Sequence, residues 1–139
     1  MKKLFGITFL IFLFINPLFA KSKYIEEGIN LFDNKKFREA KFKFEQDIVF
    51  NPKSELSYLY LSKIFKNLEK KKLQEQNLNT VILLNPKNEE ATFDLAELKL
   101  ETSDYSKSKE LNERLNSFCK NFCSESQKLK IKIENLSKK

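Results

Sequence analysis

The apolar residues of this chain recur at the three- and four-residue spacing of an amphipathic α-helix. Two stripes show it most plainly: Phe37, Ala40, Phe44 and Ile48, and then Leu61, Ile64, Phe65 and Leu68. Glycine occurs at only two positions, and the dipeptides typical of tight β-hairpins are missing from the sequence. The pattern therefore predicts an all-α protein built from amphipathic helices.

Two prolines divide these helices at a regular interval. Pro52 and Pro86 are 34 residues apart and stand in nearly identical settings, Phe-Asn-Pro-Lys and Leu-Asn-Pro-Lys. Proline has no N–H to donate and cannot continue a helix, so each one marks a boundary. A period of this length is typical of repeated helical hairpins. We therefore expect repeat units at 21–54, 55–88 and 89–122.

In this frame the chain resembles the tetratricopeptide repeat family, whose unit carries an aromatic residue, a glycine, a tyrosine, an alanine, a phenylalanine and a proline at set positions. The resemblance implies stacked helix–turn–helix hairpins, about three in number. It weakens at Gln74 and Ser108, which stand where a small alanine is usual. The residues that carry it are Tyr24, Gly28, Leu31, Ala40, Phe44 and Pro52, then Tyr58, Leu61, Leu78 and Pro86, and finally Ala96 and Tyr105.

A last helix is expected at 124–137. Leu129, Ile133 and Leu136 share one face, while lysines fill much of the other. Ser124 and Gln127 stand three residues apart, as in a capping box, in which the two side chains satisfy the first free N–H groups of a helix. Repeat arrays need such a helix to cover the apolar end of the stack.

The first residues predict export rather than a folded element. Lys2 and Lys3 precede a nearly unbroken apolar run from Leu4 to Ile15, and a small residue, Ala20, follows a proline. This order is typical of a signal peptide at 1–20, cleaved at about Ala20. The protein would then be periplasmic or secreted. An uncleaved membrane anchor is the alternative, and membrane contact is otherwise not expected.

The only two cysteines, Cys119 and Cys123, are four residues apart. In a continuous helix they would sit slightly too far apart for a relaxed disulfide, but a chain that turns before Ser124 would bring them within reach. We therefore favour a structural disulfide over free thiols. A redox motif usually has closer spacing, and a zinc site would need further ligands.

Composition argues against catalysis. The chain carries a net charge of +7 and no histidine, so it lacks the usual general base near neutral pH and the commonest metal ligand. Neighbouring acids such as Glu26 and Glu27 point in different directions on a helix. We expect a protein that is not an enzyme and has no cofactor and no metal ion. Nucleic acid is not an expected partner, because the basic residues form no concentrated patch.

The resemblance implies a concave groove lined by the first helix of each repeat. Its expected lining is apolar at one end, cationic in the middle and acidic at the far end. The groove-facing residues are Ile25, Ile29 and Phe32, then Leu59, Lys63 and Lys66, and then Phe93, Glu97 and Leu100. An alternative is that several of them are simply core. The positions at which relatives grip a chaperone's terminal carboxylate hold Ile25, Ile29, Tyr60, Glu90 and Asp94, so that activity is not expected.

Two functional hypotheses follow. The first is an exported scaffold, or adaptor, that binds an envelope protein or a peptide segment in this groove. The second is a structural component of the cell envelope that assembles with copies of itself, since three repeats are near the minimum for independent stability. Phe42 and Asp47 fit neither the repeat pattern nor the groove.

Overall fold

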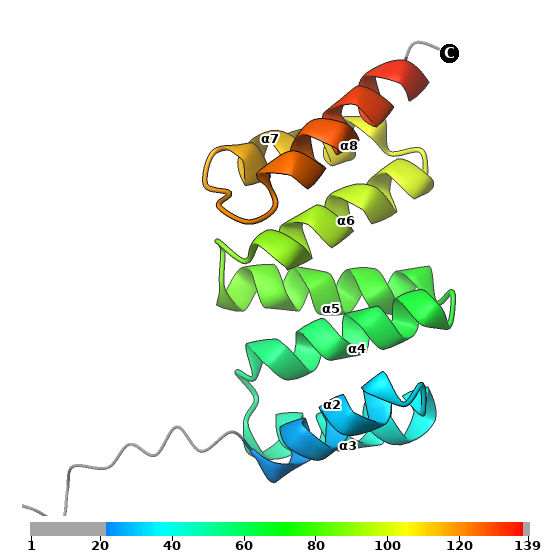
Figure 1. Ribbon diagram of the computed structural model, residues 1–139, viewed down its shortest axis with the longest axis vertical. Helices are drawn as coiled ribbons and strands as arrows, with labels where there is room; N and C mark the ends of the chain where they lie inside the picture. Colours follow the sequence, from blue (N-terminus) through cyan, green and yellow to red (C-terminus); the bar gives the residue numbers. More distant parts are fainter. Residues whose placement is uncertain (1–21, 138–139) are drawn as a thin grey trace, which may run out of the picture.

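The computed structural model describes residues 22–137, which form helices and no strand (Figure 1). This confirms the all-α prediction. The predicted signal peptide at 1–20 lies outside the described residues. None of the described helices is both long and apolar enough to span a bilayer. The helices are α2 (Lys23–Asp33), α3 (Phe37–Phe50), α4 (Glu55–Asn67), α5 (Lys71–Leu84), α6 (Glu89–Glu101), α7 (Tyr105–Asn116) and α8 (Cys123–Leu136).

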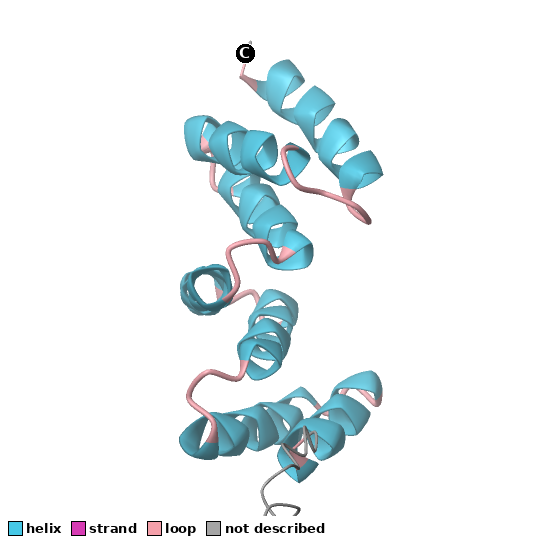
Figure 2. Cartoon of the chain, turned by 90° about the vertical axis from the view of Figure 1, so that its left-hand side faces the viewer, coloured by secondary structure: helices cyan, strands magenta, loops and turns pink. Residues whose placement is uncertain are grey.

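The first six helices form three hairpins, α2–α3, α4–α5 and α6–α7, which stack in chain order. Each hairpin lies within one of the units that the proline spacing predicts. Figures 1 and 2 show α2, α4 and α6 along one side of the stack and α3, α5 and α7 along the other. Helix α8 packs against α7 and α6 at the C-terminal end.

The turns inside the three hairpins share the same backbone geometry. Lys35, Glu69 and Ser103 follow one another at 34-residue intervals and have positive φ angles of 59°, 55° and 62°. In each turn the next residue donates its N–H to a carbonyl five residues back, as in a Schellman motif. These bonds are Lys36 to Leu31, Lys70 to Phe65 and Asp104 to Lys99, at 2.9, 2.9 and 2.8 Å. None of the three turns contains glycine, the usual residue for this conformation.

Replacing Glu69 with glycine is therefore expected to stabilise the protein. Glu69→Gly removes the strain of a left-handed side chain, and we expect the free energy of unfolding to rise by about 0.5 kcal/mol. The nearby Lys72 is exposed and lies inside α5, so Lys72→Gly relieves no strain and should lower stability. Urea denaturation of both variants measures the difference. Equal effects from the two substitutions would contradict the turn geometry.

Two apolar cores hold the stack together. The N-terminal core joins α3 to α4, and partly buried side chains of α2 pack against it. The C-terminal core runs from α4 to α8. Its members are Leu59, Leu78, Val81, Ala91, Leu95, Ala96, Leu98, Leu111, Leu129 and Ile133; those of the N-terminal core are Ala40, Phe44, Leu61, Ile64 and Phe65.

Gly28 lets α2 approach α3 closely. A Cβ atom at this position would lie only 2.8 Å from Cε1 and 2.9 Å from Cζ of Phe44. The ring of Phe44 is fully buried and is stacked on Tyr60, with 5.0 Å between the ring centroids, so it has little room to move. Close packing is thus the reason for a glycine inside this helix, where it costs about 1 kcal/mol relative to alanine.

The predicted capping box at the start of the last helix is wrong. Helix α8 begins at Cys123 after Phe122, and no side chain caps it. Ser124 consequently lies inside the first turn, and the amide of Gln127 donates to Oδ1 of Asn116 on α7, at 3.1 Å. The earlier start of the helix moves both side chains out of capping position.

Candidate functional site

The predicted groove positions lie on α2, α4 and α6, on the side of the stack opposite α3, α5 and α7. We call this side the first-helix surface. It has an aromatic end on α2 and α4, a charged middle between α4 and α6, and a closed end beside the loop that follows α7. Ile25 and Leu59 do not contribute to it, because they are only 7% and 6% exposed and belong to the interior. At these two positions the alternative given above is the right one, because both side chains belong to the core.

The aromatic end is built around Phe32 and Tyr60. The two rings meet edge to face with their centroids 5.2 Å apart, and Phe32 also contacts Phe37 at 5.5 Å. Both side chains are partly exposed, as is Ile29, while their inner faces pack on the N-terminal core. The ammonium group of Lys63 lies 4.9 Å from the centre of the Tyr60 ring. A partly exposed aromatic pair next to a cation can receive an apolar side chain of a ligand.

The charged middle consists of paired groups, not of a cationic zone facing an acidic wall. Lys63 lies 2.7 Å from Glu90, and Lys66 lies 3.4 Å from both Asp94 and Glu97. Three acids thus face two lysines across the α4–α6 interface. The middle of the surface is therefore slightly acidic, and its lysines are already engaged.

Two pKa shifts describe this cluster. Burial raises the pKa of Asp94, because the attraction of Lys66 does not offset desolvation and the repulsion of Glu90 and Glu97. Burial acts to lower the pKa of Lys66, but Asp94 and Glu97 together raise it. The two acids thus stabilise the charged form of Lys66. Lys66 does not supply enough positive charge to offset the burial of the Asp94 carboxylate. A basic group of a ligand would relieve that shortage.

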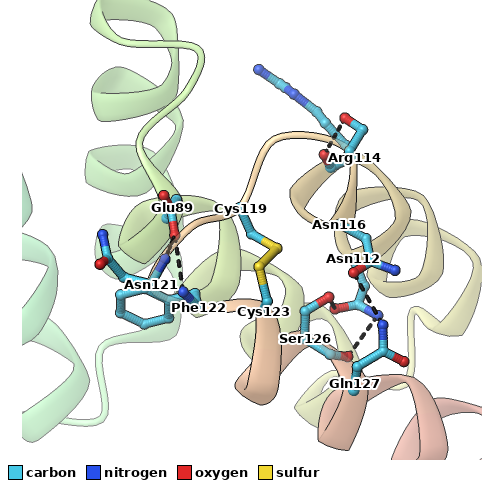
Figure 3. The surroundings of a disulfide bond; sticks show 11 residues. Glu89, Asn112, Arg114, Asn116, Cys119, Asn121, Phe122, Cys123, Ser126 and Gln127 are labelled. Atoms are coloured by element: carbon cyan, nitrogen blue, oxygen red, sulfur yellow. Dashed lines mark hydrogen bonds between the residues drawn. A yellow bond between two sulfur atoms is a disulfide. The ribbon is translucent and has the colours of Figure 1, made fainter.

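The loop after α7 closes the far end of the surface (Figure 3). A disulfide joins Cys119 and Cys123 across it. The ring of Phe122 packs against Phe93 at 5.6 Å, and the carboxylate of Glu89 accepts the N–H groups of Asn121 and Phe122 at 2.8 and 2.9 Å. Phe93 is therefore partly covered by the chain itself. Leu100 is also half-buried and packs against the C-terminal core.

The contact between Glu89 and this loop is expected to depend on pH. The backbone N–H groups of Lys120, Phe122 and Asn121 lower the pKa of Glu89 below its ordinary value of 4.5. A lowered pKa contributes stability that is present above the unfolded value and lost as the pH falls through the folded one. Glu89→Gln should therefore destabilise the protein more at about pH 7 than at about pH 3.

Denaturant titrations at the two pH values measure this difference. Glu39→Gln is the control, since Glu39 is exposed and shares no ion pair with another described residue. A loss of stability from Glu89→Gln that is as large in acid as at neutral pH would count against the charged contact.

Sequence reasoning missed Phe122 and the lysine–acid pairing. The ion pair of Lys66 and Glu97 joins residues 31 apart, and the contact of Glu89 with Phe122 joins residues 33 apart. Both separations are close to one repeat. A search for opposite charges on the first helices of successive repeats, at separations about one helical turn shorter than the repeat, would have pointed to the first of these pairs.

Solved structures decide the fold. The chain superimposes on the TPR2B domain of yeast Sti1 in its complex with an Hsp70 peptide, with a TM-score of 0.75 and 16% identity over 83% of this chain and 99% of that one. The chain has the tetratricopeptide repeat fold. The type III secretion chaperone SycD of Yersinia enterocolitica, bound to a peptide of the translocator YopD, gives a TM-score of 0.74 and 16% identity over 84% and 93%.

Another tetratricopeptide domain, the first one of Spaghetti (RPAP3) bound to the HSP90 peptide SRMEEVD, gives a TM-score of 0.73 and 18% identity over 82% of this chain and 90% of that one. No family model and no curated protein sequence matches the chain. The fold predicted from the proline spacing and the repeat residues is therefore confirmed, although the sequence identities are low.

Proposed function

We propose that this protein is a non-enzymatic scaffold that binds a segment of another protein on the first-helix surface. The observation that carries the proposal is the partly exposed pair of Phe32 and Tyr60 beside a charge cluster with one acid in excess. Domains of the same fold have been solved with peptides of Hsp70, HSP90 and YopD. Those partners belong to those proteins, and they support only the general mode of binding.

The surface favours a ligand with an apolar or aromatic anchor and a nearby basic residue. The anchor would pack against Phe32 and Tyr60, and the basic group would approach Asp94 and Glu97. A terminal carboxylate fits poorly, because Glu90 and Asp94 stand where a cation would be needed to bind it. Ile25, at another of those positions, is buried.

We further propose that the protein acts outside the cytoplasm. The apolar run from Leu4 to Ile15 after two lysines supports export, and the disulfide between Cys119 and Cys123 suits an oxidising compartment. A periplasmic or secreted adaptor for an envelope protein agrees with both. A free thiol pair in protein isolated from cells without reduction would argue against this location.

The binding proposal is tested by crosslinking in cells with tagged full-length protein, followed by affinity capture and mass spectrometry. The variant Phe32→Ala with Glu97→Gln alters both parts of the surface. The matched control, Phe42→Ala with Glu39→Gln, removes the same two kinds of side chain from the outer side of α3. We expect the first variant to weaken capture of the partner at least about fivefold, since such anchors are worth more than about 1 kcal/mol.

Circular dichroism of both variants is the check that they are folded. A partner that both variants capture as well as the unaltered protein would refute the proposed surface. Recovery of self-crosslinked copies alone, unchanged by either variant, would instead support the second hypothesis, a self-assembling structural component.

A further inference from the structure

The connections between hairpins lie at one edge of the stack, which is the left side of Figure 1 and faces the viewer in Figure 2. Contacts join neighbouring turns along this edge. Glu55, after the first turn, accepts the side-chain amides of Asn85 and Asn88 in the second, at 3.0 and 2.6 Å. Arg114 donates to the carbonyl of Pro86, at 2.7 Å. We call this side the connection edge.

Each of the two connections between hairpins, and the loop between α7 and α8, presents a lysine at this edge. Lys53 and Lys87 occupy the same position in successive repeats, and Lys120 lies in the loop after α7. All three are exposed, and no ion pair joins them to another residue in the described part of the chain. The acids of these turns, Glu55 and Glu89, accept hydrogen bonds from neutral amide and N–H groups and keep their negative charge. The three lysines and Arg114 outnumber these two acids, so the edge carries a net positive charge.

Apolar side chains stand beside these lysines. Val49 and Phe50 end α3 and are 75% and 74% exposed, and Leu83, near the end of α5, is 81% exposed. Val49 and Leu83 are again one repeat apart. Protein surfaces that bind anionic membranes combine exposed apolar side chains with lysines that have no ion-pair partner. The apolar groups enter the interface, and the lysines contact the lipid headgroups.

The start of α2 is at the same edge. Tyr24 stacks on Phe50, with 5.7 Å between the ring centroids, so the chain before Ser22 joins the fold beside the exposed end of α3. That part of the sequence contains the apolar run from Leu4 to Ile15. If the run is kept as a membrane anchor, it holds this edge next to the bilayer. If it is cleaved, the lysines and apolar side chains of the edge are unaffected.

We propose that the connection edge rests on the anionic lipid surface of a bilayer, a membrane contact that the sequence alone did not predict. Lys53, Lys87 and Lys120 face phospholipid headgroups, and the apolar side chains of Val49, Phe50 and Leu83 enter the interfacial layer. In this orientation the first-helix surface points along the membrane rather than into it. It therefore stays open to a protein ligand, and the two surfaces can be tested independently.

The test uses the processed chain from Lys21, which contains every described helix and both cores, so the apolar run cannot account for binding. Co-sedimentation is measured with phosphatidylcholine vesicles, with and without phosphatidylglycerol. We expect binding only to the anionic vesicles and release at high salt. Neutralising the edge with Lys53→Gln, Lys87→Gln and Lys120→Gln should weaken binding about fivefold per lysine.

The matched control neutralises Lys36, Lys70 and Lys72, three exposed lysines at or near the opposite ends of the hairpins, and should leave most of the binding intact. Val49→Ser with Leu83→Ser should weaken binding at least about tenfold. Equal losses from the two lysine triples, or no vesicle binding by the unaltered chain, would overturn the proposal. Dependence on the lysines but not on Val49 and Leu83 would also overturn it, in favour of a soluble polyanion.

Discussion

Phe44→Ala is expected to lower the free energy of unfolding by about 4 kcal/mol, the usual cost of emptying a phenylalanine site in a core. Phe44 is fully buried and its ring stacks on Tyr60. The ring also occupies the space where a side chain at position 28 would lie. The ring packs between Gly28 on α2 and Tyr60 on α4, so its removal leaves a cavity where α2, α3 and α4 meet. Folded domains are stable by only about 5–15 kcal/mol, so the loss is a large share.

The matched control is Phe42→Ala, on the same helix two residues earlier. Phe42 is 58% exposed, so its removal should change stability by no more than about 0.5 kcal/mol. Hydrogen exchange adds a spatial readout. In a repeat array each unit is stabilised by its neighbours, so Phe44→Ala should reduce protection in α2, α3 and α4 more than in α7 and α8. Similar losses of stability from both substitutions would contradict the assignment of Phe44 to the core.

Leu129→Ala combined with Ile133→Ala is expected to cost about 5 kcal/mol, the largest effect that we predict. Both side chains are buried against α6 and α7 and belong to the C-terminal core. Their loss separates α8 from the end of the stack and exposes apolar side chains such as Leu98 and Leu111. We therefore expect aggregation or self-association as well as lower stability, measured by light scattering and by thermal or urea denaturation.

The control for this pair uses the same helix. Ile131 and Leu136 are exposed, so Ile131→Ala with Leu136→Ala removes comparable apolar groups without opening the core. It should leave both stability and solubility nearly unchanged. A monomeric, fully stable protein with alanine at positions 129 and 133 would show that α8 is an appendage rather than part of the core.

Much of the fold could be predicted because the decisive signals are local. The apolar stripes determine which face of each helix is buried, and the prolines mark where each hairpin ends. The left-handed turns at Lys35, Glu69 and Ser103 repeat with the same period, but no glycine signals them. Hydrogen bonds to the preceding helix hold these residues in a conformation that their residue types do not favour. The sequence therefore predicted the hairpins but not the geometry of their turns.

Asp47 makes a buried hydrogen bond that no local sequence pattern predicts. Its residue type is unusual at a position that normally holds a small apolar residue, and its burial is nearly complete. Ser57, on the next helix, donates its hydroxyl to Oδ2 of Asp47 at 2.6 Å, and Ser54 lies 3.1 Å from Ser57. Ser57 alone reaches the carboxylate, and Ser54 in turn donates to Ser57, while Oδ1 of Asp47 has no hydrogen-bond partner among the described residues. Phe42 remains exposed, and no contact in the structure explains it.

The helices, their grouping into three hairpins and the closeness of the two cysteines along the chain could all be predicted from the amino-acid sequence. These features depend on spacing, which the chain carries in one dimension. Tertiary structure decided which groove residues are accessible, because stacking buries Ile25 and Leu59 while leaving Phe32 partly open. It also decided the charge of the surface. Lys66 lies beside Glu97 only because packing brings residues 31 positions apart to one interface. The interaction energy of two charges depends on the distance between them, and that distance is set by the packing of the helices.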